Sequence, residues 1–89
     1  MSDIKVLKVS SATPTKQLAG CLATCVENNE RVELRAVGAS AVNQMLKAVA
    51  ITNGIVASKG YTVLVRPCFD DFEENGETKT AIIAKVVVQ

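Results

Sequence analysis

The sequence has no histidine and no tryptophan, and its aromatic residues are Tyr61, Phe69 and Phe72 alone. Without histidine, one chain cannot form the Ser–His or Cys–His pairs on which many hydrolases depend. With so few aromatic side chains, the core has to be built from Val, Ile, Leu and Ala. Because 48% of the residues are apolar, the chain is expected to fold.

Long apolar runs, a charged leader segment and a large excess of charge are also missing. No run is long enough to cross a bilayer, and no signal-peptide pattern is visible, so we expect a cytoplasmic protein that does not contact membranes. The net charge is +1, whereas strongly nucleic-acid-binding domains usually have a larger positive excess. Residues 1–89 are expected to form one small domain.

Three cysteines, an odd number, indicate a reducing compartment. Cys21 and Cys25 are four residues apart and share a predicted helical stripe with Leu18 and Leu22. This spacing is compatible with a redox or metal pair, but a zinc site would need a carboxylate as an additional ligand. Packing of both thiols in the core is the favoured interpretation, so neither a metal nor another cofactor is expected.

Alternating apolar and polar residues predict strands over residues 4–9 and 31–37. Further extended runs predict strands over residues 61–72 and 79–88, the first of them broken or edge-like at Pro67.

Capping signals predict two helices. The first covers residues 14–28, with Thr13 as N-cap and Pro14 at the first helical position. The second starts with Ser40 as N-cap and ends near Asn53-Gly54.

The order of elements is therefore β-α-β-α-β-β, with a hairpin at Asn75-Gly76. Right-handed crossovers would place both helices on one face of a four-stranded mixed sheet, an α/β architecture of the two-layer α+β type. Residues 81–88 are apolar toward both faces of that sheet. Because one face would remain in water, a homodimer is expected. Coverage by the second helix or by the C-terminal residues is the alternative.

Candidate binding residues occur where the second strand turns at Gly38 into the second helix. Its apolar stripe comprises Val42, Met45, Leu46 and Val49. A different face presents Ser40, Asn43 and Lys47, with Gln44 beside them. Since a helix N-terminus attracts anions, these residues suit a phosphate contact. An ordinary solvated helix face is the alternative on residue types alone.

The run Val37–Ile55 closely resembles the signature of the stage V sporulation protein S family. The resemblance extends to the family's opening strand at Leu7–Ser11, its first helix at Leu18–Gly20, and strands at Arg66–Phe69 and Thr80–Ile82. Nearly the whole chain is covered. The resemblance implies a bacterial regulator of sporulation and of septum or coat formation, in hosts that need not sporulate.

More distantly, the order of elements resembles the Alba family of nucleic-acid-binding proteins. That resemblance implies an Alba-like fold, paired chains, and contact with the phosphate backbone near the starts of both helices. The residues that would make this contact are Lys16, Arg35, Ser40, Asn43 and Lys47. Two features depart from Alba proteins. Thr13 occupies a position that is often basic, and the hairpin of residues 70–77 has five acidic residues instead of a basic arm.

The sequence therefore favours a regulator that binds DNA or RNA weakly as a dimer. The alternative is a protein-interaction module whose acidic hairpin, residues 70–77, binds a basic protein partner. An enzyme is the least favoured class. The adjacent carboxylates in this hairpin point to opposite faces of a strand, and the chain has no phosphate-binding loop or dinucleotide fingerprint.

Overall fold

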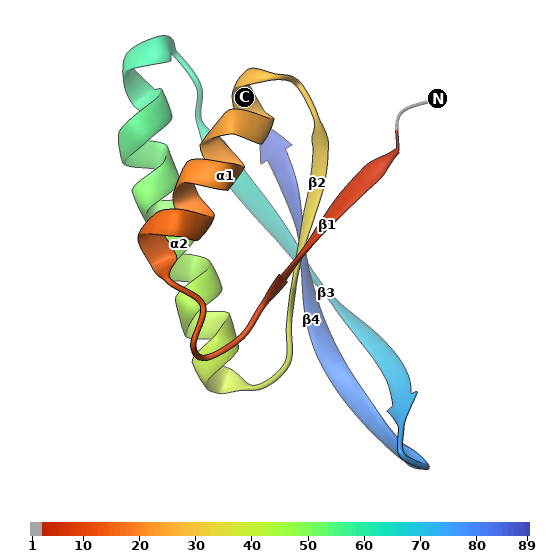
Figure 1. Ribbon diagram of the computed structural model, residues 1–89. Helices are drawn as coiled ribbons and strands as arrows, with labels where there is room; N and C mark the ends of the chain where they lie inside the picture. Colours follow the sequence, from red (N-terminus) through yellow and green to blue (C-terminus); the bar gives the residue numbers. More distant parts are fainter. Residues whose placement is uncertain (1–2) are drawn as a thin grey trace.

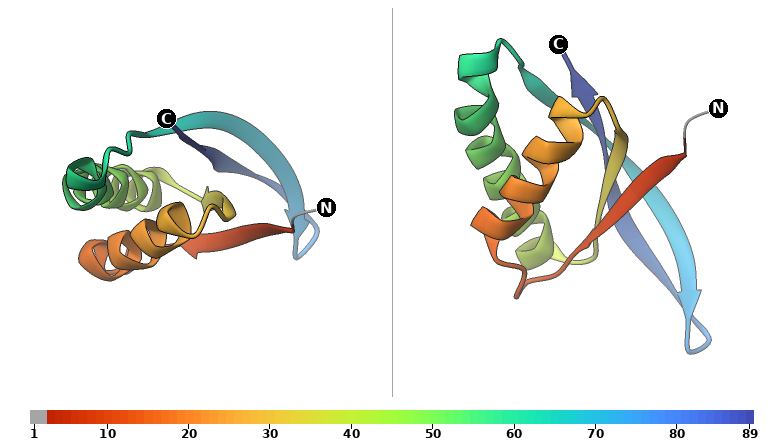
Figure 2. Two further views of the ribbon diagram at one scale, coloured as in Figure 1. Left: turned by 90° about the horizontal axis from the view of Figure 1, so that it is seen from above. Right: turned by 45° about the horizontal axis from the view of Figure 1, so that its top comes forward.

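The computed structural model describes residues 3–89 and has two layers, a four-stranded sheet and a pair of helices (Figure 1). The elements are β1 (Ile4–Val9), α1 (Thr15–Glu27), β2 (Arg31–Ala36), α2 (Ala39–Val56), the short 3-10 turn η1 (Ala57–Lys59), β3 (Val63–Glu74) and β4 (Glu77–Val88). Both helices lie on the same side of the sheet (Figure 2). The predicted β-α-β-α-β-β architecture is confirmed.

The spatial order of the strands is β1-β2-β4-β3. β1 and β2 are parallel, and β4 is antiparallel to both of its neighbours. The sheet is mixed, as predicted, and β3 is an edge strand. An edge strand tolerates proline, so Pro67 pairs with Ala84 and does not interrupt β3.

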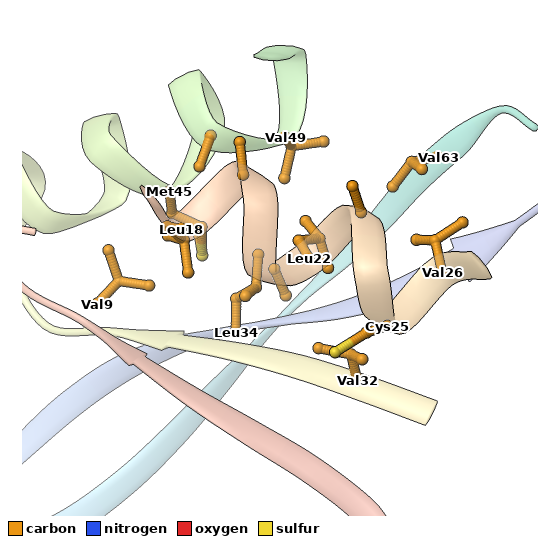
Figure 3. Close-up of a cluster of buried hydrophobic side chains, with 14 of the residues drawn as sticks. Val9, Leu18, Leu22, Cys25, Val26, Val32, Leu34, Met45, Val49 and Val63 are labelled. Carbon is orange, nitrogen blue, oxygen red and sulfur yellow. The ribbon is translucent and has the colours of Figure 1, made fainter. Parts of the chain in front are cut away.

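Alternation along β2 points Val32, Leu34 and Ala36 at the helices, and all three are buried. Figure 3 shows side chains of both helices meeting this face of the sheet. The core is aliphatic, with Leu22 and Met45 among the largest fully buried side chains. This agrees with the scarcity of aromatic residues in the sequence.

Small side chains let the two helices approach closely. Ala19 of α1 and Ala48 of α2 are both completely buried. The Thr52 hydroxyl, also buried, lies 2.8 Å from the Ala48 carbonyl oxygen and 3.3 Å from that of Ala19. Its one proton is thus shared between two backbone acceptors of different helices, and the buried hydroxyl is satisfied.

The helix starts differ from the predicted capping residues. α2 begins at Ala39 after Gly38, so Ser40 lies inside the first turn and is not the N-cap. α1 begins at Thr15 with Pro14 in the N-cap position. The Thr13 hydroxyl caps no helix; it accepts a hydrogen bond from the Ser10 N–H at 2.8 Å. This local turn contact of the Thr13 hydroxyl competes with capping of α1.

The predicted end of α2 at Asn53-Gly54 is wrong, because the helix continues to Val56 and through η1 to Gly60. Gly60 has a φ of 85°, a conformation that L residues with a side chain rarely adopt. The hairpin prediction is confirmed. Asn75 and Gly76 have φ values of 54° and 78°, as a two-residue turn of type I′ requires.

Cys21 is exposed, so the expectation that it packs in the core with Cys25 is wrong. Leu18, Leu22 and Cys25 are buried and mark the true inner stripe of α1. Cys21 lies just outside that stripe. Within residues 3–89, the three cysteines are free thiols. Neither helix has the length and hydropathy that a membrane span requires.

Asn53, which the sequence suggested as a C-cap, instead forms hydrogen bonds with the start of β3. Its Nδ2 donates to the Val63 carbonyl oxygen at 3.0 Å, and its Oδ1 accepts from the Val63 N–H at 2.8 Å. The side-chain amide therefore pairs with the first residue of β3 as a neighbouring strand would. This contact fixes where the chain returns from α2 to the sheet.

Asn53→Ala should lower the free energy of unfolding by about 1–3 kcal/mol, because the Val63 backbone groups would lose both partners. Asn43→Ala on the same helix is the matched control, since Asn43 is exposed. Urea denaturation of the two variants measures the difference. Equal free energies of unfolding for the two variants would contradict a stabilising role of the Asn53–Val63 hydrogen bonds.

Burial, assisted by a hydrogen bond to Glu30, raises the pKa of the Cys25 thiol from its ordinary value of 9.0 to about 11. Between these values the folded chain keeps a proton that the unfolded chain has lost. Stability is therefore unaffected by this group below pH 9 and declines as the pH rises toward 11.

Cys25→Ala should make that alkaline decline shallower, even though the lost sulfur lowers stability at neutral pH. Cys21→Ala, at an exposed position, should leave the slope unchanged. The measurement is the free energy of unfolding at several pH values from 9 to 11. If stability declines with pH at the same slope in the wild type, Cys25→Ala and Cys21→Ala, the decline does not come from Cys25.

Candidate nucleic-acid interface

The carboxyl ends of β1 and β2 lie at the same edge of the sheet because these strands are parallel. A hollow of about 810 Å³ opens at this edge, beside the start of α2. Its polar side chains are Lys8, Ser10, Ser11, Arg35, Ser40 and Glu74. The hollow therefore offers two cations and three hydroxyl groups against one carboxylate.

α2 begins in this hollow without a side-chain cap. Gly38 makes the turn with a φ of 91°, and the helix starts directly after it. The first N–H groups of a helix have no acceptor within it, and the helix dipole adds partial positive charge there. A phosphate oxygen in the hollow would find these donors together with the Ser40 hydroxyl.

Ser40, Asn43 and Lys47 are all exposed on α2, three and four residues apart, as predicted for one helix face. Ser40 lines the hollow, whereas Asn43 and Lys47 continue away from it along the helix. Gln44 is not part of the exposed row. Its Nε2 donates to the Thr13 carbonyl oxygen at 3.1 Å.

That hydrogen bond ties the segment before α1 to the early part of α2. It accounts for the closeness of the two helix starts that the Alba resemblance implied. Lys16, in the first turn of α1, is exposed. Lys16 and Lys47 therefore lie on the helix layer, and neither lines the hollow.

Arg35 lies apart from those lysines, on the sheet face that points away from the helices. Its Nη1 is 3.0 Å from Oδ2 of Asp70, and its guanidinium carbon is 4.8 Å from the centroid of the Phe72 ring. Arg35 and Ser40 line the same hollow. The charge of Arg35 is nevertheless already balanced in part by Asp70, which the sequence did not indicate.

The acidic hairpin is partly occupied by contacts within the chain. Besides Asp70, Asp71 accepts a hydrogen bond from the Thr80 hydroxyl at 2.7 Å. Glu74 lies 3.8 Å from the Lys79 ammonium. The acidic cluster therefore presents less unpaired charge than its sequence suggests.

Sequence reasoning missed Lys8, Ser10 and Ser11 as residues of the hollow. A signal was present: Lys8 is near the end of β1 and Ser10 and Ser11 follow it, and a right-handed crossover makes β1 parallel to the strand before Gly38. The loops after two adjacent parallel strands lie at the same edge of a sheet. Phe72 had no comparable signal, because its contact with Arg35 depends on strand pairing through β4.

The family model described as Stage V sporulation protein S (SpoVS) matches residues 5–89. Among solved structures, the chain is similar to Alba from Thermoplasma volcanium, with a TM-score of 0.64 and 13% sequence identity. That match covers 96% of this chain and 99% of the other. At this identity the likeness is one of fold, and the fold described above is Alba-like.

Proposed function

The chain belongs to the stage V sporulation protein S family, and on that premise we propose that it is a bacterial regulatory protein that binds nucleic acid weakly, mainly through phosphates. The observation that supports this most directly is the uncapped start of α2 in an open hollow with Ser10, Ser11 and Ser40. The Alba-like fold agrees with it, because the Alba resemblance implies phosphate contact at this end of the molecule.

In this proposal the hollow takes one phosphate, and Asn43 and Lys47 follow the backbone along α2. Lys16 adds a cation from the neighbouring helix. Arg35 contributes hydrogen bonds from the wall of the hollow while Asp70 offsets its charge. The small number of unpaired cations fits weak binding, and contacts to phosphate carry no sequence information.

The acidic hairpin is the weaker candidate for a binding site. Three of its carboxylates, those of Asp70, Asp71 and Glu74, already have partners in the chain. An enzymatic function has no support in the arrangement of the hollow, which contains no nucleophile paired with a base. We therefore place the protein among regulators that act by binding.

Lys47→Glu should weaken binding to duplex DNA and single-stranded RNA several-fold at low salt, because it replaces an attraction by a repulsion. The slope of log affinity against log salt should decrease by about 1 for the lost phosphate contact. Labelled oligonucleotides titrated at several salt concentrations measure both quantities. Lys85→Glu, an equal charge change on the other side of the sheet, is the matched control.

No binding by the wild-type protein at low salt would refute the nucleic-acid proposal. Equal weakening by Lys47→Glu and Lys85→Glu would refute the assignment to α2, since it would reflect net charge alone.

We further propose that two copies pair through the outer side of α2 and the helix-facing side of β3. Leu46 of α2 is 51% exposed, and Phe69 of β3 is 79% exposed. Phe69 is opposite Ile82, whose other neighbour Ala36 faces the helices, so Phe69 points to the helix side of the sheet. Contiguous exposed apolar surface commonly marks an interface, and pairing of these two elements would remove both side chains from water.

Sedimentation at micromolar concentration should give about twice the monomer mass of 9.4 kDa. Leu46→Glu with Phe69→Glu should shift the protein to the monomer, because both carboxylates would be buried in the interface. Leu64→Glu, on the opposite face of β3, should leave the dimer intact. A wild-type monomer would contradict the pairing.

A further inference from the structure

The sheet face that points away from the helices is rich in positive charge. Strand alternation and pairing place five basic side chains and two acidic ones on it, apart from the hairpin residues 71–80, which add Lys79, Glu74 and Glu77. The basic residues are Lys8, Arg31, Arg35, Arg66 and Lys85, and the acidic ones are Glu33 and Asp70. We call this surface the open face. No helix covers it in any view of the molecule (Figures 1 and 2).

Most of this charge is uncompensated. Arg35 is paired with Asp70 and Lys79 with Glu74, but Lys8, Arg31, Arg66 and Lys85 form no ion pair with residues 3–89. Arg66 and Lys85 are adjacent across β3 and β4, and both are exposed. Like charges side by side raise the free energy of the folded protein. Glu33, opposite Lys85 on β2, offsets part of this repulsion, and an anionic partner would relieve the rest.

Aliphatic side chains lie between these charges. Ile4, Val6, Leu64 and Val87 are each about half exposed, at 42%, 50%, 44% and 44%. They are on the same face as the cations because they alternate with the residues that face the helices. The surface is thus mixed, with branched apolar groups between unpaired cations.

A second copy of the chain does not suit this surface through a symmetric contact. A twofold interface places the same patch against itself, which would bring the uncompensated cations of both copies together. Single-stranded bases stack mainly on aromatic rings, so the aliphatic groups of this face suit a protein segment better than they suit single-stranded nucleic acid. Phe72, the aromatic residue on this side, is already in contact with Arg35.

We propose that the open face binds an extended, acidic protein segment whose every second residue faces the sheet, and whose facing residues include both Asp or Glu and apolar side chains. The carboxylates would pair with Arg31, Arg66 and Lys85, and the apolar side chains would cover Val6 and Val87. Arg31, Arg66 and Lys85 do not line the hollow at the start of α2, although Lys8 and Arg35 of the open face do. A regulator with both surfaces would hold nucleic acid on one side and a protein on the other.

The probe is a labelled peptide of about twelve residues built from Glu-Ser-Val-Ser repeats, here called the Glu–Val peptide, which is long enough to cross the sheet and places Glu and Val on the same side when extended. Its binding is measured by fluorescence anisotropy at physiological ionic strength. A Glu–Ser peptide of equal charge tests the apolar contribution, and a Lys–Val peptide tests the sign of the charge. We expect the Glu–Val peptide to bind most tightly and the Lys–Val peptide not to bind.

Arg66→Glu with Lys85→Glu should raise the Kd of the Glu–Val peptide by roughly tenfold or more, through lost attraction and added repulsion. Both side chains are exposed, so the fold should persist; the neutral pair Arg66→Gln and Lys85→Gln should give a smaller loss. The matched control is Lys16→Glu with Lys47→Glu on the helix layer, which should leave the Kd within about twofold because those lysines are on the other side of the molecule.

Three results would overturn the proposal: no binding of the Glu–Val peptide, equal loss in both charge-reversed pairs, or equal affinity for the Glu–Ser peptide. A fourth is loss of RNA binding, and not of peptide binding, in the Arg66→Glu and Lys85→Glu protein. The proposal would also be overturned if the wild-type protein self-associates and Arg66→Glu with Lys85→Glu abolishes this self-association. That result would assign the open face to the acidic hairpin of another copy. The peptide measurements do not depend on whether nucleic acid binds at α2.

Discussion

The close contact between α1 and α2 determines the layout of the molecule. Ala19 and Ala48 have almost no side chain to keep the helices apart, and Thr52 places its hydroxyl between carbonyl groups of both helices. Held together in this way, the helices form one layer and cover one face of the sheet. The residues that we assign to nucleic-acid binding lie on that layer or in the hollow where α2 starts, and those that we assign to peptide binding lie on the face that it leaves uncovered.

The elements could be predicted because their signals are local. Alternation identified the strands, and Asn75-Gly76 identified the hairpin, since few residues adopt two consecutive positive φ values. Helix ends were less predictable. Several residues near each end can cap or terminate a helix, and tertiary contacts decide among them. Asn53 illustrates this. Its side chain makes two hydrogen bonds to Val63 and does not cap the helix, which continues to Val56.

The type and rough position of the candidate site could be predicted, but the full set of residues that form it could not. The sequence located the start of α2 and the row of Ser40, Asn43 and Lys47. It grouped Arg35 with them, although a strand residue of that register belongs to the far face of the sheet. The ion pair with Asp70 joins residues that are far apart in the chain, and no local pattern reports such a contact. Charge counted along a sequence thus says little about how charge is distributed over surfaces.

The position of β4 has a consequence for how the protein is made. β4 is the last strand in the chain, yet it lies in the middle of the sheet, between β2 and β3. A nascent chain that has reached only β3 contains the β1–β2 pair and a third strand with no neighbour to bond. The sheet can close only when residues 77–88 have left the ribosome. Folding is therefore completed after synthesis of this strand, and the unpaired edges of β2 and β3 are exposed to other chains until then.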